Sequence, residues 1–567
     1  MTISERPWHK LYPPEIFTST EYDKRPLHEF LEESAVLYGE KKALYFMGKE
    51  LSFKEVLNQT RKLSAYLQDL GLEKGDRVSI MLPNSPQSVI AYYSVLMAGG
   101  VVVQTNPLYM QRELEYQISD SEAKMIICLD DFFPRAAAVK GKTELEHIIV
   151  TEVKDYLPFP KNIIYPFLKK KQSRLLVKAE QGADTHLWNH IMDVSDGEVH
   201  PVEVDAENDL ALLQYTGGTT GFPKGVMLTH YNLVVNTQMS VNWLYKCEKG
   251  RETVLAILPF FHVYGMTSVM NLSIMMGTKM ILMPKFEPED VLRVIEKQRP
   301  TLFPGAPTIY IALLNHPHLK KYDLSSIEAC LSGSAPLPVE VQQRFEEVTG
   351  GRLVEGYGLT ETSPVTHSNF IWGNRVSGSI GVPWPDTDAK IMKIDENEEA
   401  EIGEIGEIAV KGPQVMKGYW KKPEETTQVL SEDGWFRTGD MGYMNEEGYF
   451  FIVDRKKDMI IAGGFNIYPR EVEEVLYEHE AIQEAVVVGV PDPYRGETVK
   501  AFIVKKQGSE ISDEELDAFC RKNMAAYKVP RIYEFRKALP KTAVGKILRR
   551  TLIEEEKRKQ EGSKAVQ

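Results

Sequence analysis

A loop rich in glycine and threonine carries the strongest chemical signal in this sequence. Residues 215–225 read YTGGTTGFPKG, between apolar-edged runs at 211–214 and 226–228. Glycine has no Cβ, so such a backbone can adopt positive φ and bring its N–H groups close to a ligand. Threonine hydroxyls and a lysine add further donors. The pattern predicts a triphosphate-binding loop between two strands, with the candidate residues Thr216, Gly217, Gly218, Thr219, Thr220, Gly221 and Lys224.

This loop differs from the P-loop of nucleoside triphosphatases. No Gly-Lys-Ser/Thr occurs at the required spacing, and the loop does not run directly into a helix. An ordinary hairpin turn is the simpler interpretation of a generic Gly-Thr cluster. The density of donors and the closing Lys-Gly favour phosphate binding here.

Two carboxylates elsewhere suit a nucleotide and its metal ion. Glu361 lies between two threonines in the turn that ends RLVEGYGLTET, where it can hold a cation near phosphates. Asp440 ends the run WFRTGD and suits two ribose hydroxyls. The small residues at 333–335 let a flat ring approach the backbone, and Tyr357 offers a stacking face. An exposed acidic turn is the commoner explanation of Glu361 taken alone.

An uncharged stretch marks the expected substrate pocket. The run PFFHVYG places His262 among aromatic residues, although a satisfied core histidine is the simpler interpretation of that residue alone. No acidic residue occurs between His262 and Thr278, so a substrate ammonium would find no partner there. The pocket is therefore expected to take an apolar tail rather than an amino acid.

Composition excludes several classes of protein. A chain of 567 residues is too long for one core, so two or more domains are expected. The formal net charge of −14 argues against a nucleic-acid partner. Four scattered cysteines form neither a metal motif nor a disulfide framework, and the N-terminus lacks the apolar core of a signal peptide. The uncharged stretches 78–111 and 253–278 are broken by Pro, Gly or polar residues, and we expect buried structure rather than membrane spans. A cytoplasmic location fits.

The order of the elements predicts an α/β protein with two domains. Strands alternate with helices along residues 75–152, which implies layered subdomains with a mostly parallel sheet. A further strand is expected at 301–307, and Ser52 with Glu55 and Ser512 with Glu515 predict capping boxes at the starts of two helices. Short strands with Gly and Asp turns follow at 376–451 and suggest an antiparallel, barrel-like layer. The charged run 454–458 reads as a hinge. We therefore expect a large N-terminal domain over 1–453 and a small mobile α+β domain over 459–567.

Residues 154–178 form a basic amphipathic segment. Leu, Phe, Ile and Tyr are mixed there with a cluster of Lys and Arg, a composition that suits the surface of an anionic membrane. Pro158, Pro160 and Pro166 argue against a long helix. A solvated surface excursion with a few packed anchors is an equal alternative.

Taken together and in order, these motifs resemble the adenylate-forming superfamily of acyl-CoA synthetases, peptide-synthetase adenylation domains and luciferases. The resemblance rests on YTGGTTGFPKG, PFFHVYG, YGLTET, WFRTGD, DRKKD and PKTAVGK and covers nearly the whole chain. The motifs are most similar to those of the bacterial long-chain fatty-acid–CoA ligases. This implies that a fatty carboxylate attacks ATP to give an acyl-adenylate and pyrophosphate, and that CoA then displaces AMP.

The resemblance also implies a role for each matching residue. The loop residues named above hold the β- and γ-phosphates, Glu361 binds Mg²⁺, and Thr360 contacts the α-phosphate. Lys546 reaches into the site for adenylation and leaves for thioester formation, and Lys457 is the hinge residue. Adenine is framed by Ser334, Ala335, Pro336 and Tyr357, together with Glu355, Gly356 and Gly358. The ribose is held by Asp440 and Arg455, pantetheine passes Gly463 and Gly464, and the acyl pocket begins at His262, Tyr264 and Gly265.

Some features depart from the family or leave alternatives open. The sequence PFFHVYGMT has no tryptophan after His262, where some long-chain relatives place a gate. An aryl- or medium-chain-acid–CoA ligase, a ligase that loads a carrier protein, and a non-catalytic nucleotide- or lipid-binding protein remain alternatives. The last would typically have lost Lys546 or Glu361, and both are present. A homodimer is a candidate assembly, and a peripheral contact with the inner face of the cell membrane is a candidate location.

Overall fold

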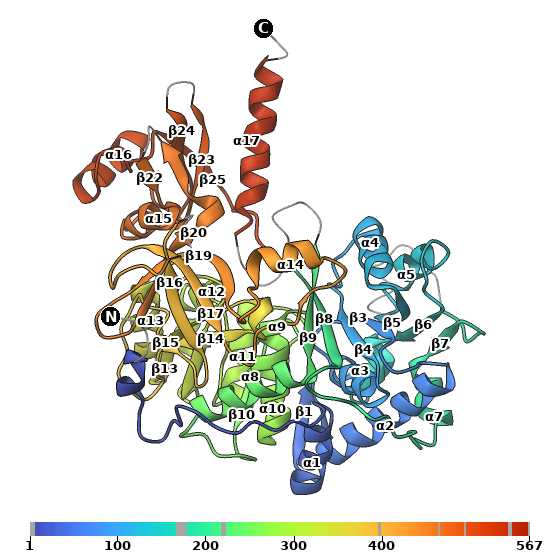
Figure 1. Ribbon diagram of the computed structural model, residues 1–567. Coiled ribbons are helices and arrows are strands. Elements are labelled where there is room, and N and C mark those ends of the chain that lie inside the picture. Colours follow the sequence, from blue (N-terminus) through green and yellow to red (C-terminus); the bar gives the residue numbers. More distant parts are fainter. Residues whose placement is uncertain are drawn as a thin grey trace.

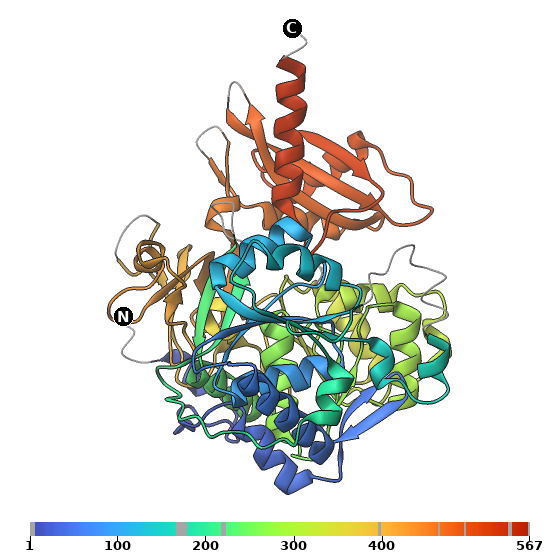
Figure 2. The ribbon, with the colours of Figure 1, turned by 90° about the vertical axis from the view of Figure 1, so that its right-hand side faces the viewer.

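The computed structural model describes residues 6–165, 179–216, 223–394, 398–462, 465–492, 495–542 and 547–564. It has a large N-terminal α/β domain and a small C-terminal domain that lies against one side of it (Figure 1). Turning the view by 90° shows the same stacking, with the last helix pointing away from the large domain (Figure 2). The predicted fold class is therefore confirmed.

The first segment forms a helical hairpin around two short strands. The capping box predicted at Ser52 is present, since its side chain accepts the N–H of Glu55 and the Glu55 side chain accepts the N–H of Ser52. Strands β1 and β2 join β10 and β11 in a four-stranded sheet of order β10-β11-β1-β2. The elements are η1 (Pro7–Leu11), α1 (Glu29–Tyr38), β1 (Lys42–Phe46), β2 (Lys49–Ser52) and α2 (Phe53–Asp69).

A sheet of eight strands forms the centre of the large domain. Its order is β18-β9-β8-β4-β3-β5-β6-β7, and the strands from β8 to β7 are parallel, as the alternation of strands and helices predicts. Strand β9 returns antiparallel to β8. The elements are β3 (Arg77–Met81), α3 (Pro86–Met97), β4 (Val101–Gln104), α4 (Gln111–Ser121), β5 (Ala123–Leu129), α5 (Phe133–Lys140), β6 (His147–Thr151), η2 (Val153–Tyr156), β7 (Thr185–Leu187), α7 (Trp188–Val194), β8 (Leu210–Thr216), β9 (Lys224–Thr229) and α8 (His230–Trp243).

The uncharged stretch after β9 is buried and unusually wound. After β10 (Thr253–Ala256), the chain forms α9 (Val263–Gly265), a π-helical turn η3 (Met266–Asn271) and α10 (Leu272–Met276). Every residue from Val263 to Met276 is buried. No helix in the described part of the chain is long and apolar enough to cross a membrane.

One predicted strand is wrong. Residues 301–307 make only single β-bridges, of Leu302 with Val254 and Ala329 and of Gly305 with Ser332. Pro304 and Pro307 lack the N–H that a continuous ladder needs. The surrounding elements are β11 (Lys279–Leu282), α11 (Pro288–Gln298), α12 (Pro307–Leu314), η4 (Leu319–Lys321), β12 (Ala329–Ser332), α13 (Val339–Thr349), β13 (Arg352–Gly358), η5 (Thr360–Thr362), β14 (Val365–Ser368) and β15 (Val382–Pro383).

An antiparallel sheet of order β16-β17-β19-β20 stands where the sequence predicts a barrel-like layer. The two-stranded pairing of β19 with β20 places Asp440 opposite Arg455. The elements of this region are β16 (Asp388–Met392), β17 (Gly406–Lys411), β18 (Gly418–Tyr419), α14 (Pro423–Val429), β19 (Phe436–Met444) and β20 (Phe450–Arg455).

The small domain packs around cores of its own. One apolar cluster joins Leu476 and Leu516 with the inner face of its sheet, and a second joins Leu552 with the other face. The capping box predicted at Ser512 is present. The elements are η6 (Lys456–Asp458), β21 (Ile460–Ala462), β22 (Phe465–Ile467), α15 (Pro469–Tyr477), β23 (Ile482–Asp492), β24 (Gly496–Lys505), α16 (Asp513–Asn523), β25 (Ile532–Arg536) and α17 (Arg549–Lys564).

Two glycines near β15 allow a matched test of backbone strain. Both have positive φ, +82° at Gly378 and +86° at Gly381, but a Cβ on Gly381 would lie 1.9 Å from the carbonyl carbon of Ser368, whereas a Cβ on Gly378 would meet nothing within 4 Å. Gly378→Ala should cost about 1 kcal/mol of unfolding free energy through φ alone. Gly381→Ala should cost at least about 3 kcal/mol because overpacking adds to the strain. Urea unfolding followed by tryptophan fluorescence measures both, and equal shifts of the midpoint would contradict the steric argument.

Candidate functional site

Strands β8 and β9 place the two ends of the predicted phosphate loop side by side. Thr216 and Lys224 are directly opposite each other in the antiparallel register. The predicted loop residues Gly217, Gly218, Thr219, Thr220 and Gly221 lie outside the described residues. The strand–loop–strand order that the sequence predicts is confirmed, and the roles of the loop residues stay predictions.

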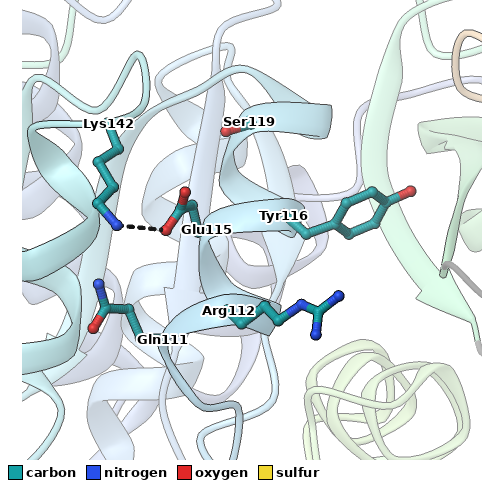
Figure 3. Close-up of a pocket in the computed structure, with 6 residues that line it drawn as sticks. All are labelled: Gln111, Arg112, Glu115, Tyr116, Ser119 and Lys142. Carbon is teal, nitrogen blue, oxygen red and sulfur yellow. Dashed lines mark hydrogen bonds and ion pairs between the residues drawn. The ribbon is translucent and has the colours of Figure 1, made fainter.

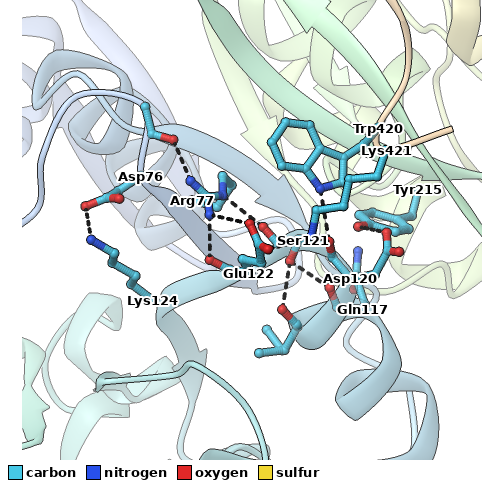
Figure 4. A network of polar contacts seen from close by, with 12 residues as sticks. Asp76, Arg77, Gln117, Asp120, Ser121, Glu122, Lys124, Tyr215, Trp420 and Lys421 are labelled. Atoms are coloured by element: carbon cyan, nitrogen blue, oxygen red, sulfur yellow. Dashed lines mark hydrogen bonds and ion pairs between the residues drawn. The ribbon is translucent and has the colours of Figure 1, made fainter. Parts of the chain in front are cut away.

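A polar network clamps the base of this loop (Figure 4). The Tyr215 hydroxyl donates to Asp120 Oδ2 on α4 at 2.6 Å. The indole N–H of Trp420 donates to the backbone carbonyl of Asp120 at 3.0 Å, and the Trp420 backbone N–H donates to the carbonyl of Gly225 at 2.8 Å. A Cβ on Gly225 would lie 3.2 Å from the Tyr215 ring and 3.3 Å from Trp420 Cβ, so the motif's last glycine is needed for packing.

The same network extends to the surface through charged groups. Arg77 donates to the backbone carbonyls of Ser121 and Glu122 at 2.9 and 3.1 Å. Lys421 pairs with the Glu122 carboxylate at 2.7 Å. Arg77 and Lys421 thus fix the end of α4. Asp120, at the same end of α4, bonds in turn to Tyr215 on β8 and to Trp420 after β18.

Lys224 and Glu361 are brought together through one aromatic residue. Lys224 forms an ion pair with Glu425 of α14, and its ammonium lies 4.9 Å from the centre of the Tyr419 ring. The Tyr419 hydroxyl donates to Glu361 Oε1 at 2.9 Å. The pairing with Lys224 lowers the pKa of Glu425, and burial raises the pKa of Glu361. A cation and a partly desolvated carboxylate therefore lie beside the base of the loop.

Glu361 fits a magnesium ion that is also held by phosphates. Mg²⁺ prefers oxygen ligands and usually takes one or two protein carboxylates together with phosphates and water. No cluster of three or more His, Cys, Asp or Glu side chains among the described residues forms a metal site by itself. A single carboxylate next to a phosphate loop is the donor set expected for a nucleotide-bound metal.

Asp440 is the centre of a second convergence. It accepts the Tyr357 hydroxyl at 2.7 Å and pairs with Arg455 Nε at 2.9 Å. Its side chain is only 6% exposed, so its charge depends on these partners. The negative charge of Asp440 raises the pKa of Arg455. The structure thus brings together three residues that the sequence assigned to the nucleoside, and it shows that the Tyr357 hydroxyl is engaged with the carboxylate.

The residues assigned to adenine lie around the ends of β12 and β13. Glu355 is buried opposite Ser332 in the parallel pairing, and its carboxylate accepts the N–H of Leu337 at 3.3 Å. Burial raises the pKa of Glu355 to about 7. Ser334 has φ of +71°, and Ala335 and Pro336 follow it at the surface of the turn. On β13, Gly356 and Gly358 leave no room for a side chain, since a Cβ would lie 2.8 Å from Leu331 Cδ1 and 2.0 Å from the Pro364 carbonyl oxygen, respectively.

The histidine of PFFHVYG begins a short helix. His262 Nδ1 accepts the backbone N–H of Tyr264 at 3.3 Å, and the Tyr264 hydroxyl donates to the carbonyl of Leu331 at 2.6 Å. Tyr264 therefore ties this helix to the strand that leads into the adenine turn. A Cβ on Gly265 would lie 2.3 Å from the Pro259 carbonyl oxygen. His262 is half-buried at the entrance to the buried stretch 263–276.

The remaining predicted positions lie in or next to the small domain. Thr360 begins the η5 turn that carries Glu361, and Lys457 lies in the middle of η6 with an exposed side chain. Gly463, Gly464 and Lys546 lie outside the described residues. Ile547 pairs with Lys541 by a β-bridge, and the Leu548 N–H donates to the Pro540 carbonyl at 2.8 Å.

Sequence reasoning missed four residues of this site, namely Asp120, Tyr419, Trp420 and Glu425. Each belongs to a segment with no motif of its own, and each contacts a residue of the phosphate loop's flanks or Glu361. The segment GYWKKPEE combines two aromatic residues with a helix that begins at a proline. This pattern predicts a turn that packs against the protein, but it does not tell which residues the turn contacts.

A polar depression of about 510 Å³ lies on the surface beside this clamp (Figure 3). It is lined by side chains of α4 and by Lys142, which pairs with Glu115 at 3.1 Å. Tyr116 belongs to its wall, and the Tyr116 hydroxyl donates to the Pro223 carbonyl at 3.0 Å. None of the residues assigned to the nucleotide lines this depression, so it adjoins the site without forming it.

Comparison with known proteins agrees with this geometry. Residues 31–420 match the model of the AMP-binding enzyme family, and residues 471–546 match the AMP-binding enzyme C-terminal domain. The chain is 60% identical to a long-chain-fatty-acid–CoA ligase of Bacillus subtilis over 98% of both chains, and 40% identical to one of Salmonella typhimurium over 97% of this chain and 98% of the relative.

Solved structures of related enzymes share the fold. An anthranilate CoA ligase, AuaEII, in complex with anthranoyl-AMP superposes with a TM-score of 0.85 and 28% identity, over 95% of this chain and 98% of that chain. ATP-bound MatB from Rhodopseudomonas palustris superposes with a TM-score of 0.81 and 30% identity, over 94% and 99%. The family match spans most of the chain and the relatives span nearly all of it: this chain belongs to the AMP-binding enzyme family.

Proposed function

We propose that this protein ligates a long-chain fatty acid to CoA at the expense of ATP. The observation that carries the proposal is that Tyr419 contacts both Lys224, at the end of the phosphate loop, and Glu361, and that Glu361 lies close enough to the Asp440–Arg455 pair for their charges to interact. The 60% identity to a long-chain-fatty-acid–CoA ligase over nearly the full length supports the choice of substrates.

The reaction divides into two balanced steps. In the first, an oxygen of the fatty carboxylate attacks the α-phosphorus of ATP, and the bond to the β-phosphate oxygen breaks to release pyrophosphate. In the second, the CoA sulfur attacks the acyl carbon and loses its proton to solvent, and the acyl carbon–oxygen bond of the mixed anhydride breaks so that AMP departs with its electrons. The first step joins two anions, so its rate depends on how well the site neutralises phosphate charge.

The residues of the site have separable roles in that neutralisation. Lys224 is held by Glu425 within reach of the loop's end and can exchange this partner for a phosphate. Mg²⁺ bound at Glu361 supplies further positive charge. Asp440 is anchored by Tyr357 and Arg455, so it presents fixed oxygens to the two hydroxyls of the ribose.

The acyl chain is assigned to the buried stretch behind His262. Residues 263–276 are uncharged and contain Met266, Met270, Met275 and Met276, whose flexible side chains adapt to irregular apolar ligands. A π-helical turn in this stretch is a feature often found at functional sites. Each buried methylene adds about 0.8 kcal/mol of binding, which favours long chains over short ones. If the protein were instead an aryl- or medium-chain-acid–CoA ligase, benzoate or octanoate would react faster than the long-chain acids.

Domain movement is part of the proposal. Lys546 belongs to a different domain from the phosphate loop, so it can serve adenylation only in one domain arrangement. We place the hinge at 454–458, between domains 1–453 and 459–567, with Lys457 at its centre. Gly463 and Gly464 are assigned to the pantetheine path of the second step.

A peripheral membrane contact completes the proposal. Phe159, Ile163 and Ile164 are 79%, 55% and 48% exposed, close to one another in sequence and beside Lys161. Exposed apolar side chains next to a cation suit an anionic bilayer surface. This would place a cytoplasmic enzyme at the inner face of the membrane, near lipid-derived substrate. The homodimer stays a prediction.

The substrate assignment predicts a defined profile of pyrophosphate release. With ATP, Mg²⁺ and acids from acetate to oleate, release should rise with chain length, and with CoA present each pyrophosphate should be matched by one thioester. Pyrophosphate without thioester would redirect the second step to a carrier protein. A maximum at benzoate or octanoate would contradict the long-chain assignment.

The role of Lys546 predicts a split between the half-reactions. Lys546→Ala should lower acyl-adenylate formation at least about 100-fold, because it removes a charge that acts in the first transition state, and should spare thioester formation from supplied oleoyl-AMP. Lys541→Ala is the matched control, since Lys541 is an exposed lysine five positions earlier in the sequence that pairs with Glu484 at 2.5 Å. Equal loss of both half-reactions in Lys546→Ala would contradict the role.

The membrane contact predicts loss of vesicle binding on removal of the apolar side chains. Replacing Phe159, Ile163 and Ile164 by serine should lower the partition onto vesicles of phosphatidylcholine and phosphatidylglycerol about ten-fold or more in a sedimentation assay. Val36→Ser is the control, because Val36 is 83% exposed on α1 and lies outside this segment. Unchanged sedimentation of the triple variant would remove the membrane proposal and leave the ligase proposal intact.

A further inference from the structure

A cluster of largely buried charges joins the start of α17 to the hinge. Arg549 makes two hydrogen bonds to the carboxylate of Glu473 on α15, both 2.6 Å long. Its second terminal nitrogen lies 3.4 Å from Asp454 Oδ1 and 3.6 Å from Asp458 Oδ2. The side chains of Arg549 and Asp454 are 22% and 2% exposed, so neither charge is well solvated by water.

Asp454 belongs to the sheet of the large domain, whereas its partners belong to the small one. It pairs with Met441 in the register of β19 and β20. Its carboxylate accepts the backbone N–H of Arg470, the second residue of α15, at 2.7 Å. Helices α15 and α17 contribute Leu476 and Leu552 to the cores of the small domain. The charge cluster therefore spans the boundary between the two domains.

The contacts of Arg549 divide into two kinds. Arg549 and Glu473 both lie on elements of the small domain, so their two-pronged bond persists when that domain rotates about 454–458. The contacts that Asp454 makes with Arg549 and with the Arg470 N–H join the moving domain to β20, and rotation at the hinge breaks them. These contacts of Asp454 therefore stabilise only the domain arrangement in which they are formed.

This arrangement faces the start of α17 toward the nucleotide residues. Asp458 lies near Arg549, and its negative charge contributes to raising the pKa of Arg455. Arg455 is in turn paired with Asp440. A continuous line of alternating charges thus runs from the ribose carboxylate to α17. In the sequence, Arg549 follows the proposed catalytic lysine by three residues. Because this arrangement brings the start of α17 close to the ribose residues, it is compatible with the ATP-dependent step.

We propose that Arg549 is a positioning residue for adenylation. Through its contacts with Asp454 on β20 and Asp458 in η6, it holds the small domain against the hinge segment. The proposal rests on the proposed function, because it is defined by the two half-reactions. Arg549 itself touches neither substrate. Its removal should shift the balance between the steps rather than abolish both.

The test compares the two half-reactions in single preparations of each variant. Pyrophosphate release with oleate, ATP and Mg²⁺ measures the first step, and thioester formation from supplied oleoyl-AMP and CoA measures the second. Arg549→Gln and Asp454→Asn should each lower the first rate about ten-fold and change the second less than about two-fold. Arg549→Lys keeps the charge, but a single ammonium cannot bond both oxygens of Glu473 and also reach Asp454. The first rate of Arg549→Lys should therefore lie between those of Arg549→Gln and wild type.

The ratio of the two rates is the deciding quantity, because both rates scale alike with the fraction of folded enzyme. Arg521→Gln is the matched control, since Arg521 makes two hydrogen bonds to Asp517 within α16 of the same domain. The control ratio should equal that of wild type. An unchanged ratio in Arg549→Gln would mean a purely structural role and overturn the proposal, and a loss confined to the second step would overturn its assignment to adenylation. A wild-type enzyme inactive in both assays would instead refute the proposed function.

Discussion

The ion pair between Asp440 and Arg455 is the interaction on which the site depends. A carboxylate that is 6% exposed is poorly solvated by water and is stabilised by a close cation, which Arg455 provides at 2.9 Å. Asp440 lies on β19 and Arg455 ends β20 within the hinge segment 454–458, so one ion pair serves both the nucleotide site and the boundary of the domains. Any movement that displaced Arg455 from Asp440 would leave a buried carboxylate without its cation. Rotation must therefore occur after Arg455, which is consistent with a hinge that begins at the end of this strand.

A second constraint is that distant segments must meet at the base of the phosphate loop. Asp120 on α4, Tyr215 on β8 and Trp420 after β18 come from three regions of the sequence and are joined by hydrogen bonds of 2.6 and 3.0 Å. A loop that binds phosphate through backbone N–H groups needs fixed ends, because ordering it at the moment of binding costs conformational entropy. Because the hydrogen bonds of Asp120 already order the ends of the loop in the folded protein, this entropy is lost during folding and not when phosphate binds. Gly225 belongs to the same packing, because it lies between the Tyr215 ring and the Cβ of Trp420.

The sequence predicts local structure and motif residues well because both depend on neighbours in the chain. The capping boxes at Ser52 and Ser512 and the strand–loop–strand order around Lys224 follow from local propensities. The contacts of Asp120 with Tyr215 and Trp420 span 95 and 300 residues and have no local signature. The wrong strand at 301–307 has a related cause, since its β-branched and apolar residues fit a strand but two prolines limit it to single bridges. Roles in catalysis came from the family resemblance, and the geometry gives Tyr357 a partner that no motif specifies.

The two halves of the reaction limit how strong a domain latch can be. An enzyme that must visit two arrangements in every turnover cannot favour one by much more than about 5 kcal/mol, because the other would then be populated less than about once in several thousand molecules. The distances around Arg549 follow this requirement. Its two bonds of 2.6 Å go to Glu473, which moves with it, and its looser contacts of 3.4 and 3.6 Å go to Asp454 and Asp458 in the hinge segment. The strong charge-assisted bonds to Glu473 keep the guanidinium in place in both arrangements, and rotation must break its looser contacts together with the 2.7 Å bond from the Arg470 N–H to Asp454.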